Sequence, residues 1–465
     1  MNDGTSNSDS ESSPIVRKKV FGPAKDMEYL RTTYNSILKN TASVRDINPT
    51  GPGATLMHIL KANIGIGMLS MPNAIQNAGY VLGPILLILM GIIATHCMTL
   101  IVTASHHLCA LFELPALSYA DVAQLSIAYK SKRPWLGQMA RILVNLMLLL
   151  TQLGFCCTYI AFVAKNVILL IENSGSIPFQ YRLIIVMILP IFLLGSYIRS
   201  LKYLAPFSTA GNFCYLYSII VILAYCLTIV LKNGLGPGVQ AFSTTPLTYP
   251  LFFGNVIFAF EGIGCILPQE NKMSNPNLFV PILWIGMVLV ITSFVILGVF
   301  GYFAFGSNLA EVISLNLPER VMSPIDLVYT VAIVYLTFGI FSSYLVQFYV
   351  PIEIIEPIFI RRIQSPKLKI LVQYIIRTIL VTFTALIPIV IGQIDLLIDL
   401  IGACSSTCIA LIFPAVIEIV SFWRVRRYCL PFYLWVIKDI IILSIGLIGG
   451  VLGTGVAMYN IVLKF

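Results

Sequence analysis

The chain alternates between long apolar runs and short polar segments. Most of the runs reach the roughly 20 residues that an α-helix needs to cross the hydrocarbon core of a bilayer. Membrane strands would instead alternate apolar and polar positions over about ten residues. The pattern predicts an all-α polytopic membrane protein of about eleven transmembrane helices. The predicted spans lie near 54–77, 81–105, 139–171, 182–199, 206–231, 249–271, 279–305, 325–350, 371–391, 396–421 and 432–462.

Composition supports the same class. Of the 465 residues, 58% are hydrophobic and only 11% are charged, with a mean hydropathy of +0.90, whereas soluble domains carry about 25% charged residues. Lysine and arginine fall mainly on one predicted side, and the other side holds only Arg182, Lys232, Arg320 and Lys464. This asymmetry predicts a cytosolic N-terminus. The net charge of +9 follows from that topology, and no compact basic face indicates nucleic-acid binding.

Residues 1–53 differ from the rest of the chain. They are rich in Ser, Asn, Asp, Lys and Arg and end at Gly51-Pro52-Gly53. These residues contain no short apolar stretch followed by a cleavage site, so the sequence does not predict a signal peptide. We expect residues 1–53 to be a disordered cytosolic tail and residues 54–465 to form the transmembrane domain.

Two predicted spans, about two hundred residues apart, are interrupted near their middles. The first contains Lys61 and the sequence Asn63-Ile64-Gly65-Ile66-Gly67, and the second contains Phe258-Ala259-Phe260-Glu261-Gly262. Non-helical backbone is tolerated at membrane depth only against protein or a watery cavity. Two interrupted helices at corresponding positions in the two halves of a chain indicate a transporter's binding site.

The two interruptions offer complementary chemistry. A half-helix beginning near Met68 would present free N–H groups, which favour a carboxylate, and a half-helix ending near Phe260 would present carbonyls, which suit an ammonium group. Together they predict a site for a zwitterion, which indicates an α-amino acid. The alternative is that the glycines only allow close helix packing. The candidate substrate-binding residues are Asn63, Gly65, Ile66, Gly67, Phe258, Phe260, Glu261 and Gly262. A valine at position 65 should fill the cavity and strain the backbone.

Three segments carry a specific resemblance. MHILKANIGIGMLSMPNAIQNAGYVLGPI, YPLFFGNVIFAFEGIGCILPQENKM and VQFYVPIEIIEPIF closely resemble the proton-coupled amino acid transporters of the amino acid/auxin permease group. The resemblance implies a leucine-transporter-type 5+5 inverted repeat with helices 1 and 6 broken. It also implies proton symport of small neutral amino acids. Animal members carry cysteines in the loops after spans three and seven, whereas 172–181 and 306–324 have none, so an external disulfide is not expected.

Three ionisable residues within the spans are candidates for proton coupling. A carboxyl group such as Glu261 in a low-dielectric core can carry a proton near neutral pH. Lys61 is a candidate partner of Glu261, either structural or functional. The resemblance places His58 at the family's candidate proton-sensing histidine, and an unperturbed histidine titrates near pH 6.5. The alternative for His58 is an ordinary core histidine.

Other features have simpler interpretations. Asp395 and Asp399 open the tenth span, where they could cap the helix N-terminus or form part of a gate. Glu353 and Glu356 close the eighth span beside cytosolic arginines and predict a solvated cluster. Small residues on the last span, Gly446, Gly449, Gly450, Gly453 and Gly455, predict helix packing, within the chain or between subunits of an oligomer. No cofactor motif, metal-ligand set or catalytic arrangement indicates an enzyme.

The sequence therefore predicts a secondary active amino acid transporter. The leading hypothesis is proton symport of alanine, glycine or proline across a plasma, lysosomal or vacuolar membrane. Sodium-driven or uncoupled transport remains open, because Ser70, Ser405, Ser406 and Thr407 could supply hydroxyl ligands. An amino acid-sensing receptor with little flux is the third hypothesis.

Overall fold

The computed structural model describes residues 50–173, 180–199, 201–318, 324–361, 363–426 and 432–463. The predicted tail up to residue 49 lies outside these residues. The described part is helical, with one isolated bridge between Thr50 and Met273. The main helices are α3 (Pro52–Asn63), α4 (Ile66–Ala78), α5 (Leu82–Phe112), α6 (Tyr119–Ser131), α7 (Pro134–Asn173), α8 (Tyr181–Ser196), α9 (Leu201–Asn233), α10 (Thr248–Ala259), α11 (Ile263–Lys272), α12 (Phe279–Phe305), α13 (Pro324–Ile360), α14 (Pro366–Ile391), α15 (Ile394–Ile401), α16 (Phe413–Arg426) and α17 (Phe432–Val462).

The predicted spans correspond to these helices. Each of the eleven ranges coincides with a helix or with a pair of successive helices, and the first and sixth ranges are the interrupted pairs α3–α4 and α10–α11. The tenth range also departs from a regular α-helix, because π-helical turns at Gly402–Ser406 and Cys408–Ile412 join α15 to α16. Nine spans in the described residues are long and apolar enough to cross a membrane. The count of eleven crossings stays a prediction. The sequence interpretation missed α6, which lies between the second and third spans.

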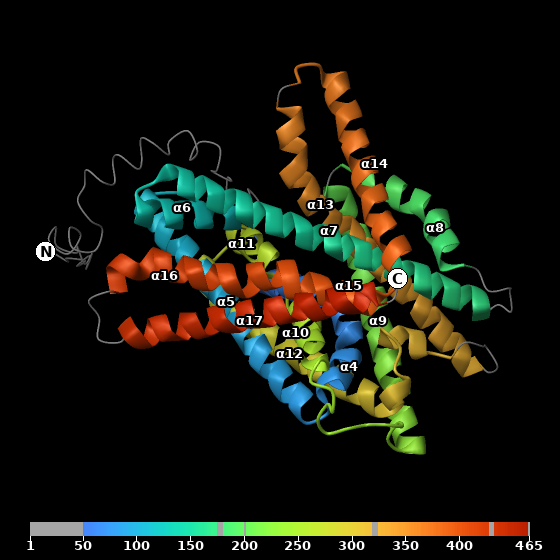
Figure 1. Cartoon of the computed structure of the whole chain (residues 1–465). Helices are drawn as coiled ribbons and strands as arrows, with labels where there is room; N and C mark the ends of the chain where they lie inside the picture. The colour runs from blue at the N-terminus through green and yellow to red at the C-terminus, as the bar shows by residue number, and fades with distance from the viewer. Residues whose placement is uncertain are drawn as a thin grey trace, which may run out of the picture.

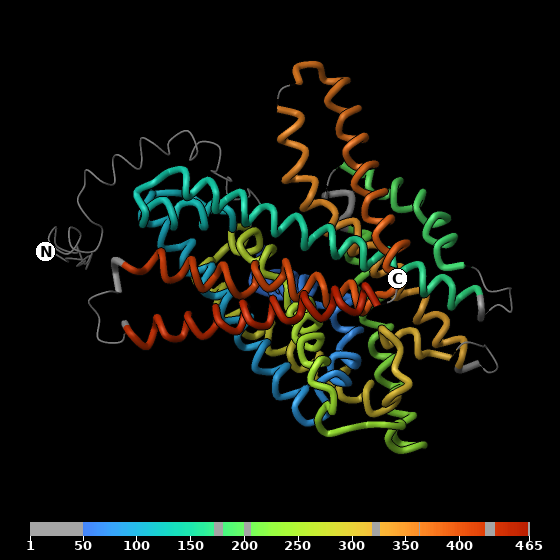
Figure 2. Tube along the Cα trace, in the orientation of Figure 1, coloured from blue at the N-terminus to red at the C-terminus, as the bar shows by residue number. Residues whose placement is uncertain are grey.

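The broken helices lie inside the bundle. Figure 1 shows α4 and α10 below α17, with the long α7 crossing the molecule above α16 and α17. The two C-terminal helices α16 and α17 run side by side. In Figure 2 the end of α13 and the start of α14 project from the bundle as a helical hairpin. Helix α4 packs against α10 and α12, and α10 packs against α15 and α17. The interruptions therefore lie against protein, as unpaired backbone in a membrane requires.

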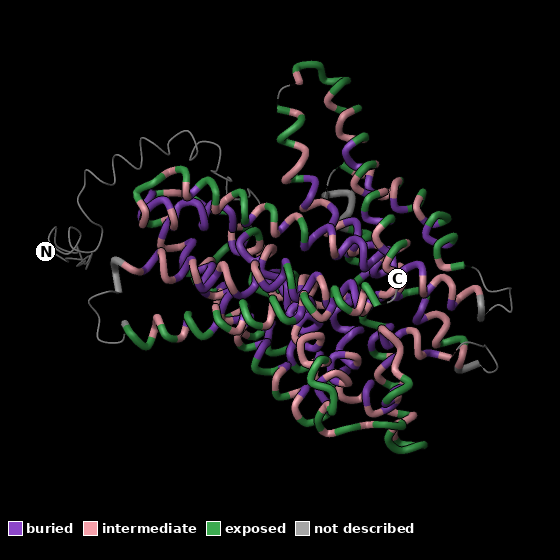
Figure 3. Tube along the Cα trace, viewed as in Figure 1, coloured by how far each residue is buried: buried purple, intermediate pink, exposed green. Residues whose placement is uncertain are grey.

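Burial separates an inner core from an outer apolar surface. The inner turns of the central helices are buried and the outer turns are exposed (Figure 3). Large apolar side chains such as Ile448 and Val451 of α17 are more than 60% exposed. Such a surface is typical of helices that face lipid, because hydrocarbon solvates apolar side chains as well as the protein interior does.

Glycines allow α17 to approach the core closely. A Cβ atom built at Gly449 would lie 2.5 Å from the Phe253 ring, and one at Gly453 would lie 2.7 Å from the Ala403 side chain. Gly446 and Gly450 also face residues of the same chain, whereas Gly455 faces open space. The predicted small-residue face is therefore used within the chain, and an oligomer through this helix stays a prediction.

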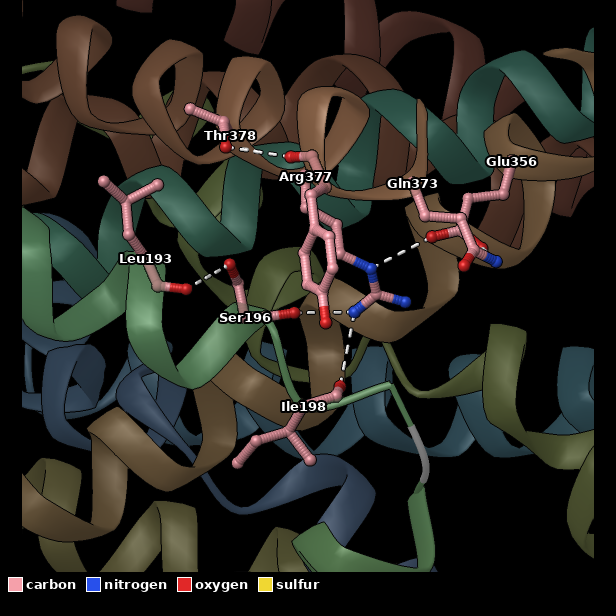
Figure 4. Close-up of polar contacts among 8 residues, drawn as sticks. Leu193, Ser196, Ile198, Glu356, Gln373, Arg377 and Thr378 are labelled. Carbon is pink, nitrogen blue, oxygen red and sulfur yellow. Dashed lines mark hydrogen bonds and ion pairs between the residues drawn. The ribbon is translucent and has the colours of Figure 1, made fainter. Parts of the chain in front are cut away.

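A buried arginine joins three helices on the side of the α13–α14 hairpin (Figure 4). The Arg377 side chain, from α14, is 3% exposed, and its Nε donates to Glu356 of α13 at 3.0 Å. Its Nη1 donates to the carbonyl of Ser196 at 2.6 Å and to that of Ile198 at 3.3 Å. The prediction of a solvated cluster agrees with the exposed Glu353 but is wrong for the Arg377–Glu356 pair, whose side chains are only 3% and 13% exposed. The ion pair joins α14 to α13, and the two hydrogen bonds to carbonyls fix the end of α8 to this pair of helices.

We expect Arg377→Gln to lower the free energy of unfolding by about 3–5 kcal/mol, because removing one partner of a buried ion pair leaves the other without compensation. The measurement is the apparent melting temperature of purified protein in detergent. Lys367→Gln on an exposed turn of the same helix is the control and should leave the melting temperature unchanged. Equal melting temperatures for both variants would contradict this role of Arg377.

Candidate functional site

The first interruption separates α3 from α4. Ile64 is extended, and Gly65 follows with a φ of −162° and a ψ of −149°. Helix α4 then begins at Ile66 without a side-chain cap. The N–H of Met68 donates to the Gly65 carbonyl at 3.1 Å, whereas those of Ile66 and Gly67 have no partner within the helix, so this turn presents donors and the positive end of the helix dipole. The hydroxyl of Tyr215, from α9, donates to the Gly65 carbonyl at 2.7 Å and fixes the turn from outside.

The second interruption separates α10 from α11. Helix α10 ends at Ala259, Phe260 and Glu261 connect the two pieces, and Gly262 precedes α11. The Glu261 side chain is 3% exposed, and its Oε1 atom has no hydrogen-bond partner. This end of α10 therefore places a buried carboxyl group beside carbonyls that the helix leaves without partners.

The two interruptions touch each other. A Cβ atom built at Gly67 would lie 2.6 Å from the Cα atom of Ala259, so only a glycine lets α4 approach α10 this closely. One turn further along, the Ser70 hydroxyl lies 2.7 Å from Asn255 Oδ1 and 2.9 Å from the Gly67 carbonyl. The contact brings the start of α4 and the end of α10 to one place.

A cavity of about 370 Å³ opens at this contact. It extends toward His58, in the middle of α3, and toward Gln269 and Lys272, in the C-terminal part of α11. Other lining residues include Asn63, Gly65, Gly67, Phe155, Tyr159, Ser208, Phe258, Glu261, Ser343 and Gln347. Its volume lies in the range of small-molecule sites, about 300–1,000 Å³.

The opposite end of the bundle is held together by polar contacts. Gln76 donates to the Gly306 carbonyl at 3.3 Å, and the N–H of Tyr80 donates to the Gln240 carbonyl at 3.0 Å. Lys165 of α7 pairs with Glu311 at 2.5 Å. The cavity thus reaches the face that carries the start of α3, which the lysine and arginine distribution predicts to be cytosolic.

Most of the predicted site residues meet at this cavity. Asn63, Gly65, Ile66, Gly67, Phe258 and Glu261 line it, and so do His58 and Lys61. Phe260 does not, because its ring packs against Phe294 of α12 with centroids 5.1 Å apart. Gly262 lies behind Asn63, whose Oδ1 would be 2.9 Å from a Cβ atom at position 262. The roles assigned to these residues remain predictions.

The three proton-coupling candidates have different surroundings. Glu261 is buried, Lys61 is partly exposed, and His58 is exposed on the side of the cavity mouth. In the described part of the chain no ion pair joins Lys61 to Glu261. The predicted partnership of Lys61 with Glu261 is therefore absent from this conformation.

Sequence reasoning missed the residues that other helices contribute. Phe155 and Tyr159 come from α7, Ser208 from α9, and Ser343 and Gln347 from α13. The available signal was a polar side chain inside an apolar run, which is rare unless it faces protein or a cavity. That signal does not distinguish these residues from buried polar residues elsewhere, such as Asn166.

Comparison with known proteins agrees with this geometry. The family model of transmembrane amino acid transporter proteins matches residues 48–459. The Drosophila melanogaster protein named proton-coupled amino acid transporter-like protein pathetic is 32% identical over 424 residues, covering 89% of this chain and 86% of its own.

Solved structures show the fold. MhsT in complex with L-phenylalanine has a TM-score of 0.52 at 14% identity, covering 86% of this chain and 98% of its own. The inward-facing structure of Mhp1 has a TM-score of 0.53 at 13% identity, covering 90% and 93%.

The chain belongs to the transmembrane amino acid transporter family. It is an integral membrane protein with a leucine-transporter-type fold, and the resemblance found in its sequence is confirmed.

The two glycines of the first interruption should respond differently to substitution. The extended backbone at Gly65 accepts other residues, and a Cβ atom there would meet only the Tyr159 hydroxyl, at 3.6 Å. The expectation that valine would strain the backbone is therefore wrong. We expect Gly65→Val to reduce uptake by filling the cavity while leaving the melting temperature unchanged.

Gly67→Ala is the matched variant. Its methyl group would overlap the backbone of Ala259, and overpacking of this kind costs about 1–3 kcal/mol. We expect a lower melting temperature in detergent together with reduced uptake. Normal uptake by Gly65→Val would show that the substrate does not bind beside this residue.

Proposed function

We propose that the protein is a secondary active symporter that moves small neutral amino acids, such as alanine, glycine and proline, together with protons. The observation that carries the proposal is the meeting of the first turn of α4 with Glu261 in one cavity of about 370 Å³. The free N–H groups suit the substrate carboxylate, and the carbonyls and carboxyl group at the end of α10 suit its ammonium group.

The properties of Glu261 support coupling to protons. An ionised carboxylate at 3% exposure without a cationic partner is costly. A proton on Glu261 would remove that cost and would leave the carbonyls at the end of α10 to hold the substrate ammonium group. Proton and substrate could then occupy the site together, which is what symport requires.

The arrangement around Gly65 offers less support for sodium coupling. Of the hydroxyl groups that the sodium hypothesis invoked, those of Ser70, Ser405 and Thr407 bond to backbone carbonyls of their own helices. Ser70, Ser405, Ser406 and Thr407 are all absent from the cavity lining. The Gly65 carbonyl already accepts from Tyr215.

A receptor with little flux differs from a symporter by the absence of net uptake. We infer a plasma, lysosomal or vacuolar membrane as the location, and transport rather than catalysis as the activity.

Uptake of alanine, glycine or proline should rise as external pH falls from about 7.5 to about 5.5, and should carry inward positive charge. Glu261→Gln keeps the size of the side chain but cannot titrate, so it should flatten this pH dependence while the melting temperature stays unchanged. The measurement is amino acid-evoked current at both pH values, with and without sodium. Sodium-dependent, pH-independent current would favour the sodium-driven alternative, and binding without current would favour the receptor.

The carboxylate site predicts selectivity between acids and amides. Hydrogen bonds to a charged group contribute about 1.5–3 kcal/mol each, so amino acid amides should compete with uptake at least about tenfold more weakly than the free acids. Competition curves for alanine and alanine amide against labelled proline measure this difference. Equal competition would place the carboxylate away from the first turn of α4.

A further inference from the structure

A second buried acid lies on the far side of the α4–α10 contact from the cavity. Asp399 belongs to α15, its side chain is 3% exposed, and its Oδ1 atom has no hydrogen-bond partner. Helix capping does not explain the position of Asp399, because Asp399 lies in the second turn of α15. Two other acids accept hydrogen bonds from the N–H groups at the N-terminus of this helix. Asp395 accepts from the N–H of Leu396, and Glu311 accepts from the N–H of Ile394, both at 2.9 Å.

Asp399 borders a cavity of about 250 Å³ that is separate from the substrate cavity. The cavity lies between the C-terminal part of α4, the start of α10, the start of α15 and the end of α17. Its polar lining consists of Asn73, Asn77, Asp395, Asp399 and Asn460. These helix ends belong to the face opposite the start of α3, which is the predicted external side. The cavity therefore offers Asp399 a polar route toward that side.

Polar side chains lie between Asp399 and the first interruption. The Asn255 side chain is next to the Asp399 carboxyl group, its Nδ2 atom has no hydrogen-bond partner, and its Oδ1 accepts from Ser70. The Ser70 hydroxyl also bonds to the carbonyl of Gly67, in the turn that lines the substrate cavity. The backbones are in direct contact as well, since a Cβ atom at Gly254 would lie 2.5 Å from the Asp399 carbonyl oxygen.

The charged groups around Asp399 do not neutralise an anion. Asp395, one turn earlier, is another acid, and Lys165 is paired with Glu311 at 2.5 Å. The facing residues of α4, α10 and α17 are asparagines and Ser70, which carry no charge. In the part of the chain that the structure describes, no lysine, arginine or histidine forms an ion pair with Asp399. An ionised Asp399 would be a buried anion beside a second acid, which is strongly unfavourable.

We propose that Asp399 is a second proton-binding site, loaded from the external side through the asparagine-lined cavity and distinct from Glu261. The protonated form allows α15 to stay against α10 when the external side is closed. The ionised form requires water and therefore favours separation of these helices. The site deepens the proposed function, because it gives the external proton a binding group linked to the substrate turn through Asn255 and Ser70.

The protonation of Asp399 can be tested without any transport. The probe is the infrared band of protonated carboxyl groups in purified protein, recorded in the Glu261→Gln background so that Glu261 does not contribute. We expect Asp399→Asn to remove the intensity of one carboxylic acid near neutral pH. The control is Asp395→Asn, which removes an acid from the same cavity and should leave that band unchanged. Asp399→Glu should shift the band rather than remove it, which keeps the test valid if the asparagine variant folds poorly.

Transport then tests the link to the external side. With Glu261 intact, Asp399→Asn should retain exchange of internal for external amino acid but lose most of the acceleration by external acid, whereas Asp395→Asn should keep both. An unchanged infrared band in Asp399→Asn overturns the proposal, and so does a band that sodium ions abolish. If the band assigns a proton to Asp399 but the parent protein transports without pH dependence, the symport proposal fails while the proton site stands.

Discussion

The architecture depends on one constraint, which is that backbone groups released from a broken helix inside a membrane must find partners within the protein. This chain breaks two helices at the same depth and places the breaks against each other. Gly67 allows backbone-level contact with Ala259, and the Ser70–Asn255 hydrogen bond fixes their register. Tyr215 satisfies the Gly65 carbonyl from a third helix. Residues of both breaks, Gly65, Gly67 and Glu261 among them, line the cavity, so the proposed binding surface includes groups that helix breaking leaves unpaired.

The intramembrane charges fall into two classes. Arg377 of α14 is paired with Glu356 of the preceding helix α13 at 3.0 Å, and Lys165 of α7 is paired with Glu311, in the connection between α12 and α13, at 2.5 Å. Lys438 similarly pairs with Glu418 of α16 at 2.7 Å. Glu261 and Asp399 have no such cation, although both are 3% exposed. Paired charges hold elements in place, whereas a buried acid without a cation is sensitive to protons and ligands.

The two unpaired acids lie on opposite sides of the α4–α10 contact. Glu261 borders the cavity that opens toward α3 and α11, and Asp399 borders the closed side. Helices α4 and α10 are the elements that both acids share, since α10 ends beside Glu261 and carries Asn255 next to Asp399. A change at either acid is therefore transmitted to the same pair of half-helices. By contrast, Arg377 holds α8, α13 and α14 together away from this contact.

The sequence by itself determined the class of protein, the two breaks and several residues of the breaks that line the cavity, because lipid imposes length and polarity on each span independently of the others. The free donors near Gly65 and the buried Glu261 could be predicted for the same reason, since both follow from local helix interruption. The packing of Phe260 against Phe294 and the contributions of Tyr159 and Gln347 to the cavity depend on how distant helices pack, which local periodicity does not encode. Only the tertiary structure could show that Arg377 is paired and that Asp399 is not. The residue type determines the charge of a side chain, but the packing of distant helices determines which ion-pair partner that side chain has.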